Sequence, residues 1–301
     1  MTLAALPPVI DSTMLVTWRA CPRKFYLSFC ENLAPSGKSV HLHFGGAVAK
    51  GLEVARRAFF INGVPAPQAE ALGINAALEF YGDFEPPEKS SAKSWGGLLI
   101  AMDGYFKQWP LGQDSVKPYK NGIEVNFALP IPGAFRPDGS PWIYGGRYDM
   151  LAEIDGILHI EDDKTTGGSF SFSWSEQWHL RNQFLGYIWA AQQHGLPVER
   201  CLIRGISVLK TKNDYAQALA HYPKHMIDRW FQQTVRDLNR ISAQWTEGYF
   251  DFNLGDTCTS FGGCPFNSPC STTVPEEWYS MFAKRDWDPV RQNPEVMEQA
   301  A

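Results

Sequence analysis

The sequence predicts an α/β protein in which a mixed central sheet is flanked by helices. Apolar residues alternate in 150–154 and 157–160 on either side of Asp155-Gly156, which is typical of a β-hairpin with a tight two-residue turn. A helical pattern at 176–194 and an apolar strand at 200–210 follow, which gives the order β-β-β-α-β. The 301 residues are 44% hydrophobic and 14% aromatic, enough for a sizeable core.

A helical region is expected before the sheet, at residues 1–115. Ser12 or Thr13 is the candidate N-cap of its first helix. A loop rich in proline and charge, at 85–89, separates the last two helices. The four expected helices span 12–30, 45–60, 67–83 and 94–109.

The core of the fold, which contains the central sheet, is expected within residues 116–222. A first strand at 122–129 and a connecting loop at 130–141 precede the hairpin, and Gly195-Leu196-Pro197 ends the helix that follows it. The last region, 223–301, contains a long amphipathic helix to about residue 247, then a cysteine-rich loop and a frayed tail after Asp286. The three regions are expected to form one compact unit.

Composition and charge narrow the class of protein. The formal net charge of −5 counts mildly against nucleic-acid binding, which normally leaves a basic footprint. No apolar run is long enough to cross a bilayer, and the N-terminus lacks the pattern of a secretory signal, so we expect a cytoplasmic protein. Basic pairs are expected to be ordinary solvated positions: Arg23-Lys24, Arg56-Arg57, Lys117 with Lys120, Arg200 with Arg204, and Lys210 with Lys212.

The hairpin also carries two acids and a lysine, which a metal-dependent phosphodiesterase needs. Side chains two apart on a strand share a face, so Asp162 and Lys164 point the same way, and the antiparallel neighbour brings Asp149 beside them. Carboxylates bind Mg²⁺ or Mn²⁺, and the lysine would act on the attacking water or offset charge on the phosphate. Glu161 and Asp163 should face the opposite side. The alternative is an exposed hairpin whose charges are only solvated.

Six cysteines in a chain without an export signal indicate metal ligands or buried thiols rather than disulfides. Cys30 and Cys201 lie in apolar surroundings and are expected to be buried. The other four would hold an iron–sulfur cluster or a tetrahedral zinc, and their spacing, wider than C-x2-C, makes zinc the weaker choice. The alternative is a loop with free thiols. These four are Cys21, Cys258, Cys264 and Cys270.

The hairpin, the helix after it and the cysteines together resemble the PD-(D/E)XK nuclease superfamily. The resemblance is to its RecB-like iron–sulfur exonucleases, such as the CRISPR-associated four-cysteine exonucleases, the AddB nuclease domain and phage-encoded relatives. It spans about residues 12–272. The matching residues are Asp149 in the Gly-Arg-x-Asp strand, Asp162-Asp163-Lys164-Thr165 in the Asp-x-Lys-Thr strand, Gln183 and Tyr187 in the Gln-x3-Tyr helix, and one cysteine before the core with three after it.

This resemblance implies a restriction-endonuclease-like core with a C-terminal iron–sulfur loop. It implies a DNA exonuclease preferring single-stranded ends, acting in recombination, repair, or phage or CRISPR DNA processing, with other proteins of those pathways as partners. Its setting would be a bacterial, archaeal or phage-infected cell. Asp149, Asp162 and the backbone carbonyl of Asp163 would bind Mg²⁺ or Mn²⁺. Lys164 would act on the water, Gln183 and Tyr187 would grip the substrate, and a 4Fe-4S cluster would be structural.

One position departs from the family. Where the family's N-terminal helix has a metal-binding histidine, this chain has Ala49, which binds no metal. Glu53, one turn along, or His41 and His43 upstream would be substitutes, although each histidine fits a surface or capping residue better. The sequence leaves open whether Ala49 is natural or engineered. It also leaves open a nuclease-derived DNA-binding or adaptor protein with weakened chemistry.

Two further groups have alternative interpretations. Glu124 would orient Lys164 or a metal-bound water, or is a plain exposed strand residue. Five tryptophans would stack on single-stranded bases, but their helical spacing favours the core. A third alternative is a structural protein held together by zinc. It would require the matches of the hairpin and of the Gln-x3-Tyr helix to the family motifs to be accidental. The tryptophans are Trp174, Trp178, Trp189, Trp230 and Trp245.

Overall fold

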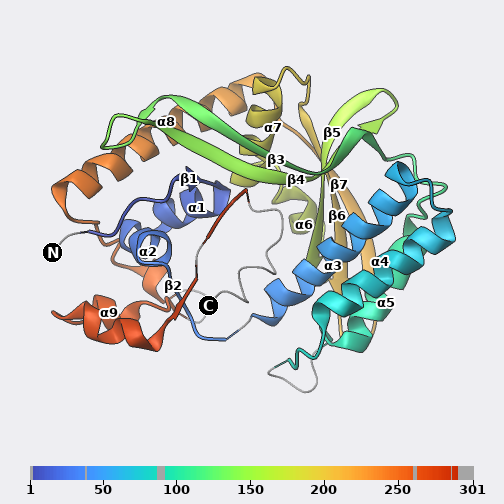
Figure 1. Cartoon of the computed structure of the whole chain (residues 1–301), viewed down its shortest axis with the longest axis horizontal. Coiled ribbons are helices and arrows are strands. Elements are labelled where there is room, and N and C mark those ends of the chain that lie inside the picture. Colours follow the sequence, from blue (N-terminus) through green and yellow to red (C-terminus); the bar gives the residue numbers. More distant parts are fainter. Residues whose placement is uncertain (1–2, 38, 87–91, 260–262, 286, 291–301) are drawn as a thin grey trace. The chain divides into compact units, whose positions relative to one another are not determined.

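The computed structural model describes residues 3–37, 39–86, 92–259, 263–285 and 287–290 (Figure 1). Most of the expected loop at 85–89 and most of the expected frayed tail lie outside these ranges. The chain divides into two compact units. One comprises Met1–Gly37, Asn126–Arg147 and His225–Ala301, and the other comprises Lys38–Val125 and Tyr148–Lys224. The predicted division into 1–115, 116–222 and 223–301 stays a prediction. Each of the two units contains segments from more than one of these regions.

A mixed sheet confirms the predicted fold class. Its order is β1-β4-β5-β6-β7, with β3 also paired to β4. The pairings β4-β5 and β6-β7 are antiparallel, whereas β1-β4 and β5-β6 are parallel. The strands are β1 (Val9–Ile10), β3 (Lys117–Phe135), β4 (Pro141–Ile154), β5 (Ile157–Thr166), β6 (Arg200–Val208) and β7 (Asn213–His221).

The predicted hairpin is formed by β4 and β5. Met150 pairs with Glu161, and the register runs to Ile154 opposite Ile157. Asp155 and Gly156 have φ angles of 49° and 78°, and two positive φ angles are what a type I′ turn requires. Because this turn fixes the register, it decides which face of β5 each acidic side chain takes.

The expected loop at 130–141 is shorter than predicted and spans 136–140, because β3 continues to Phe135 and β4 begins at Pro141. The prolines suggested a loop, but β3 lies beside β4 alone in the sheet order, and proline is tolerated on an edge strand. Strand β7 was not predicted. It follows β6 after a short turn, and its antiparallel register begins with Val208 opposite Asn213.

The helix expected at 176–194 begins later, as α7 (Asn182–Gln193), and a short helix, α6 (Phe172–Glu176), precedes it. Trp178 lies in the turn between them, where it is 4% exposed and packs edge-on against Trp174. Burying this large side chain favours the break, which helical periodicity alone does not reveal.

Three helices cover one face of the sheet in the second unit. They are α3 (Val40–Arg56), α4 (Ala66–Tyr81) and α5 (Trp95–Gln108), with a π-helical turn, Arg57–Ile61, after α3. They confirm the expected helices there. Helix α3 contacts β5, and α5 contacts β6 and β7; Figure 1 shows all three helices on the same side of β6 and β7.

Helices α3 and α4 cross at two glycines. A Cβ on Gly51 would lie 2.7 Å from the carbonyl oxygen of Gly73, closer than van der Waals contact allows. We expect Gly51→Ala to cost about 1–3 kcal/mol of unfolding free energy through overpacking. Gly96→Ala on α5 is the matched control, because a Cβ there meets nothing within 4 Å. It should be neutral or stabilising. Equal denaturation midpoints for both variants would contradict this packing.

In the other unit, the expected helix at 12–30 is interrupted at Cys21. Helix α1 (Ser12–Ala20) is followed by α2 (Pro22–Phe25) and a π-helical turn, Tyr26–Cys30. Cys21 is extended, as residues before proline usually are. The expected cap at Ser12 or Thr13 is wrong: the side chain of Asp11 accepts the bond from the Met14 N–H at 2.7 Å.

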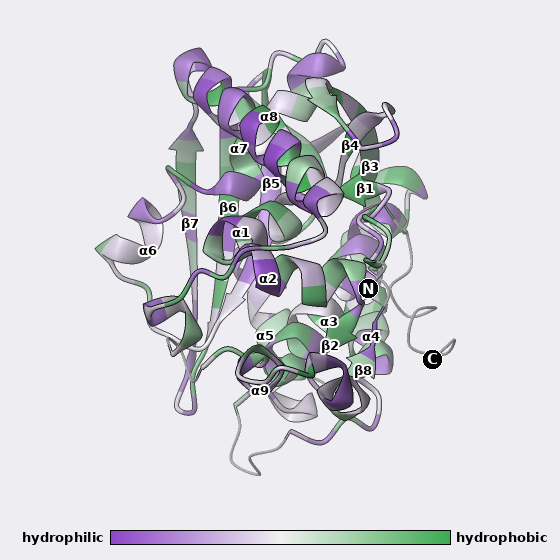
Figure 2. Cartoon of the chain, turned by 90° about the vertical axis from the view of Figure 1, so that its left-hand side faces the viewer, coloured by the Kyte–Doolittle hydropathy of each residue, from purple (hydrophilic) through white to green (hydrophobic). Residues whose placement is uncertain are grey.

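The long amphipathic helix is confirmed as α8 (Lys224–Glu247). Its buried residues recur every three or four positions, from Ile227 and Trp230 to Leu238 and Ile241, and Figure 2 shows hydrophilic residues along much of its remaining surface. In the same unit, β2 (Leu33–Ala34) pairs with β8 (Ala283–Lys284). Among the described residues, no helix combines the length and apolar character needed to cross a membrane.

Candidate active site

The predicted site residues of β5 and α7 meet around Asp162. Gln183 Nε2 donates to Asp162 Oδ1 at 3.1 Å and lies 3.1 Å from the Tyr187 hydroxyl. Lys164 Nζ forms an ion pair with Asp162 Oδ2. The predicted shared face of Asp162 and Lys164 is therefore present, and so is the shared face of Gln183 and Tyr187, one helical turn apart.

Asp149 lies beside this group on β4. Its Oδ2 accepts a hydrogen bond of 3.1 Å from the backbone N–H of Asp163. Burial raises the pKa of Asp149, and the Lys164 charge opposes this rise. Burial also raises the pKa of Asp162 to about 7, although Lys164 lowers it and Asp149 raises it further. A nearby cation stabilises the ionised forms of two carboxylates that are buried close together.

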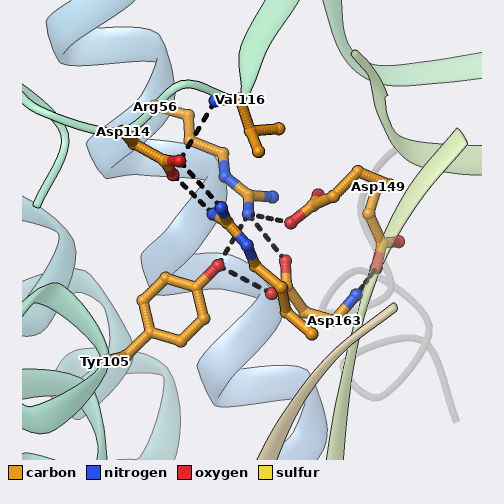
Figure 3. Close-up of polar contacts among 8 residues, drawn as sticks. Arg56, Tyr105, Asp114, Val116, Asp149 and Asp163 are labelled. Atoms are coloured by element: carbon orange, nitrogen blue, oxygen red, sulfur yellow. Dashed lines mark hydrogen bonds and ion pairs between the residues drawn. The ribbon is translucent and has the colours of Figure 1, made fainter. Parts of the chain in front are cut away.

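The opposite face of β5 carries a buried charge network (Figure 3). As predicted, Glu161 and Asp163 point away from Asp162. Arg56 Nη2 lies 2.7 Å from Glu161 Oε1 and 2.8 Å from Asp163 Oδ2, and it donates to the Tyr105 hydroxyl at 2.9 Å. Burial raises the pKa of Glu161 to about 8, while Arg56 lowers it. Arg204 forms a two-pronged pair with Asp114 at 2.6 and 2.8 Å.

The expectation that Arg56 and Arg204 are solvated is wrong. Their side chains are 5% and 3% exposed, because the buried carboxylates around them require counter-charges. A signal was available in the sequence. Residues 161–164 are four consecutive charged residues in a strand that is otherwise rich in apolar residues. Both faces of the strand therefore carry charge, and the face of Glu161 and Asp163 needs a basic side chain as a counter-charge.

Helix α3 turns the position of the missing histidine toward β5. A Cβ on Gly45 would lie 3.5 Å from Thr165 Oγ1, and Arg56 contacts Asp163. Ala49 is one turn beyond Gly45 and about two turns before Arg56, so it shares this face. Glu53 is engaged elsewhere, with Arg57 Nε at 3.0 Å and Lys50 Nζ at 3.5 Å.

The upstream histidines lie on α3 and Glu124 lies on β3. His43 Nε2 is 3.0 Å from the Tyr81 carbonyl oxygen, with its ring against Phe84, and His41 is exposed. Glu124 is a half-buried residue of β3 with a φ angle of 52°. Its suggested role on Lys164 stays a prediction, as do the substitute-ligand roles of Glu53, His41 and His43.

Four cysteines line one cavity of the first unit, together with Phe252, Asn253 and Phe266. Burial raises the pKa of Cys270 to about 11, and the neighbouring cysteines raise it further. Four thiols around one cavity are the donor set that an iron–sulfur cluster uses. Cys30 and Cys201 are buried as expected. The cysteines of the cavity are Cys21, Cys258, Cys264 and Cys270.

Oxygen donors around Asp162 fit a hard divalent cation, and thiols around the cavity fit a cluster. Within the described ranges, no set of three or more His, Cys, Asp or Glu side chains is arranged to hold a metal ion.

The tryptophans belong to the core rather than to a stacking surface. Trp174, Trp178, Trp189 and Trp230 are each less than 10% exposed, and Trp245 is half-buried and donates to the Ala4 carbonyl at 2.9 Å. These positions leave little ring face for a base. The exposed aromatic side chain near the site residues in sequence is Phe172, which is 81% exposed.

Comparison with known proteins shows the family. The family model of the PD-(D/E)XK nuclease superfamily matches residues 12–271. Among solved structures, a protein from Eubacterium rectale named "Putative exonuclease" is 16% identical, with a TM-score of 0.46, and the match covers 83% of this chain and 87% of that one. A protein named SSO0001 is 13% identical, with a TM-score of 0.26, and the match covers 63% and 74%.

No curated protein sequence is significantly similar to the chain. The family match spans most of the chain and includes the hairpin, the Gln-Tyr helix and all four cavity cysteines. The chain belongs to the PD-(D/E)XK nuclease superfamily.

Proposed function

We propose that the chain is a RecB-like, Mg²⁺- or Mn²⁺-dependent DNA exonuclease that prefers single-stranded ends and carries a structural 4Fe-4S cluster. The observation that carries this proposal is the arrangement around Asp162. Its two oxygens contact Lys164 and Gln183, and Asp149 is bonded to the next backbone N–H of the same strand. Its cellular role would be DNA recombination, repair, or phage or CRISPR DNA processing in the cytoplasm.

Each residue has a distinct part in this proposal. Asp149, Asp162 and the backbone carbonyl of Asp163 would hold one or two divalent ions. A divalent ion supplies a water of lowered pKa and offsets charge on the scissile phosphate. Lys164 lies beside Asp162 with its side chain 30% exposed, so its ammonium group can orient the attacking water or donate to a phosphate oxygen. Gln183 and Tyr187 would position the strand.

The cluster would hold together parts of the first unit that are distant in sequence. Cys21 belongs to the N-terminal segment, and the other three cysteines belong to the C-terminal one. Hydrogen bonds already join these segments, from the Arg23 N–H to the Asp251 carbonyl at 2.9 Å and from Asn253 to the Ala20 carbonyl at 2.7 Å. A cross-link at this place would restrict the unfolded chain strongly.

One observation favours a second candidate function. Ala49 lies on the face of α3 that is turned toward β5 and supplies no metal ligand there. A chain that binds DNA with little cleavage, acting as an adaptor, would be consistent with this loss. The intact Asp149, Asp162 and Lys164 favour the nuclease.

The test is a cleavage assay on anaerobically purified protein. End-labelled linear single strands, linear duplex and closed circular single strands are incubated with Mn²⁺, Mg²⁺ or EDTA. We expect linear single strands to shorten in a metal-dependent manner, while circles stay intact and EDTA stops the reaction. Cleavage of circles would contradict action from ends.

Ala49→His decides between the two candidates. If the nuclease lacks only a ligand, the histidine should lower the metal concentration needed for half-maximal cleavage by about ten-fold or more, as changes in the surroundings of a metal typically do. DNA binding without cleavage in both forms of the chain would favour the adaptor.

A further inference from the structure

Strand β5 is charged on both faces, and the rear face is organised by one residue. Arg56 is the last residue of α3, and its Nη2 atom lies within 2.9 Å of Glu161, Asp163 and the Tyr105 hydroxyl. Tyr105 also donates to Asp163 Oδ1 at 2.8 Å. Both carboxyl oxygens of Asp163 are thus engaged, by groups from α3 and α5 (Figure 3).

These contacts are buried, so they are rigid and specific. The side chains of Arg56, Glu161 and Asp163 are 5%, 0% and 4% exposed. Away from water, a charged hydrogen bond is strong, and an unpaired partner is costly. A guanidinium group donates in fixed directions, so Arg56 holds β5 at a defined distance from α3.

Asp163 joins this rear contact to the front of the strand. Its side chain is held by Arg56, while its backbone N–H donates to Asp149 Oδ2 at 3.1 Å. Its neighbours in sequence, Asp162 and Lys164, form the ion pair on the front face. A shift of Asp163 would therefore move Asp149, the Asp163 carbonyl and the Asp162–Lys164 pair relative to one another.

We propose that Arg56 is a positioning residue of the metal site, which sets the backbone of β5 at Asp163 so that Asp149, Asp162 and the Asp163 carbonyl are aligned for a divalent cation. Arg56 touches neither cation nor DNA, and acts only through Asp163. The inference rests on the proposed function, because it assigns Arg56 a part in the same site.

The test measures Mn²⁺ affinity by the electron paramagnetic resonance of free Mn²⁺, together with cleavage rate and melting temperature. Arg56→Met should weaken Mn²⁺ binding by about 10- to 100-fold, as the loss of outer-shell support typically does. Arg19→Met is the control, because Arg19 is a partly buried arginine of the first unit, where its Nε pairs with Asp237 Oδ2 at 2.7 Å. It should lower the melting temperature, with Mn²⁺ affinity within about three-fold of the original.

A second variant separates positioning from charge balance. Arg56→Met combined with Asp163→Asn removes one positive and one negative charge and keeps the Asp163 backbone. Because Glu161 alone then loses its ion-pair partner, it should melt above Arg56→Met but below the original chain, and still bind Mn²⁺ about ten-fold more weakly. Arg56→Lys keeps the charge but loses the fixed geometry, so it should lie between the original and Arg56→Met.

Three results would overturn the inference. The first is unchanged Mn²⁺ affinity in the double variant, or in folded Arg56→Met. The second is equal weakening by Arg19→Met, which would trace the effect to general destabilisation. The third is a failure of the original chain itself to bind Mn²⁺ or cleave DNA. That result would remove the proposed function as well, and it differs from the first two because the original chain is active in them.

Discussion

Replacing Lys164 by methionine is expected to lower the rate of DNA cleavage by about 10²- to 10⁴-fold, the range for loss of a group that acts on a proton or on developing charge. Lys164 Nζ is paired with Asp162 Oδ2, and the charges of Asp162 and Asp149 raise the pKa of Lys164 against the lowering effect of burial. The ammonium group therefore stays charged at neutral pH, ready to act on the phosphate or the water.

Methionine is chosen because it preserves the length and the apolar stem of lysine. Lys212→Met is the matched control. Lys212 is also a lysine of the second unit that pairs with an aspartate, Asp214 at 2.9 Å, but its side chain is 64% exposed, and such surface pairs contribute little. Its cleavage rate should be unchanged. The measurement is the initial rate on labelled single strands, with DNA affinity measured separately by fluorescence anisotropy.

The outcome also tests how the front face of β5 works. If Lys164→Met cleaves as fast as the original chain, either the activity comes from a contaminating nuclease or the lysine has no part in the reaction. If cleavage falls while DNA affinity is unchanged, Lys164 acts in the chemical step.

The sequence predicts best those parts of the fold that depend on local pattern. The hairpin followed from the apolar pattern on either side of Asp155-Gly156, and the turn does show two positive φ angles. Helices α4 and α5 followed from their periodicity. The errors lie where tertiary packing overrides local preference. The prolines of β3 are tolerated because the strand lies at an edge, and the helix pattern at 176–194 is broken because Trp178 is buried.

The candidate site likewise has features that local sequence pattern predicts and features that depend on tertiary packing. Asp149, Asp162 and Lys164 are brought together by strand alternation and hairpin register, which are both readable from sequence. The Gln183–Asp162 contact needs the packing of α7 on the sheet. The family resemblance indicated Gln183 as a substrate-gripping residue but did not predict this contact. The buried role of Arg56 was missed because its partners are distant along the chain. Glu161 is 105 residues away in sequence, and Asp163 lies two residues further.

Loss of one cavity cysteine should have the largest effect on stability. In Cys264→Ser, a cluster would lose one of four thiolates, so the protein should lose the visible absorbance of an iron–sulfur centre. Because the cluster would join the N-terminal and C-terminal segments of the first unit, its loss should cost about 4 kcal/mol or more of unfolding free energy, the magnitude of cross-linking a long loop. Spectra and denaturation curves of anaerobically purified protein measure both effects.

Cys30→Ala is the matched control for this prediction. Cys30 is a cysteine of the same unit, buried at 7% exposure, but it does not line the cavity. Its replacement removes only a small buried group, which should cost about 1 kcal/mol and leave the absorbance intact. If the original chain is colourless and contains stoichiometric zinc, the four cysteines form a zinc site rather than an iron–sulfur cluster. A colourless, metal-free chain with equal stability in both variants would mean that the four cysteines are free thiols.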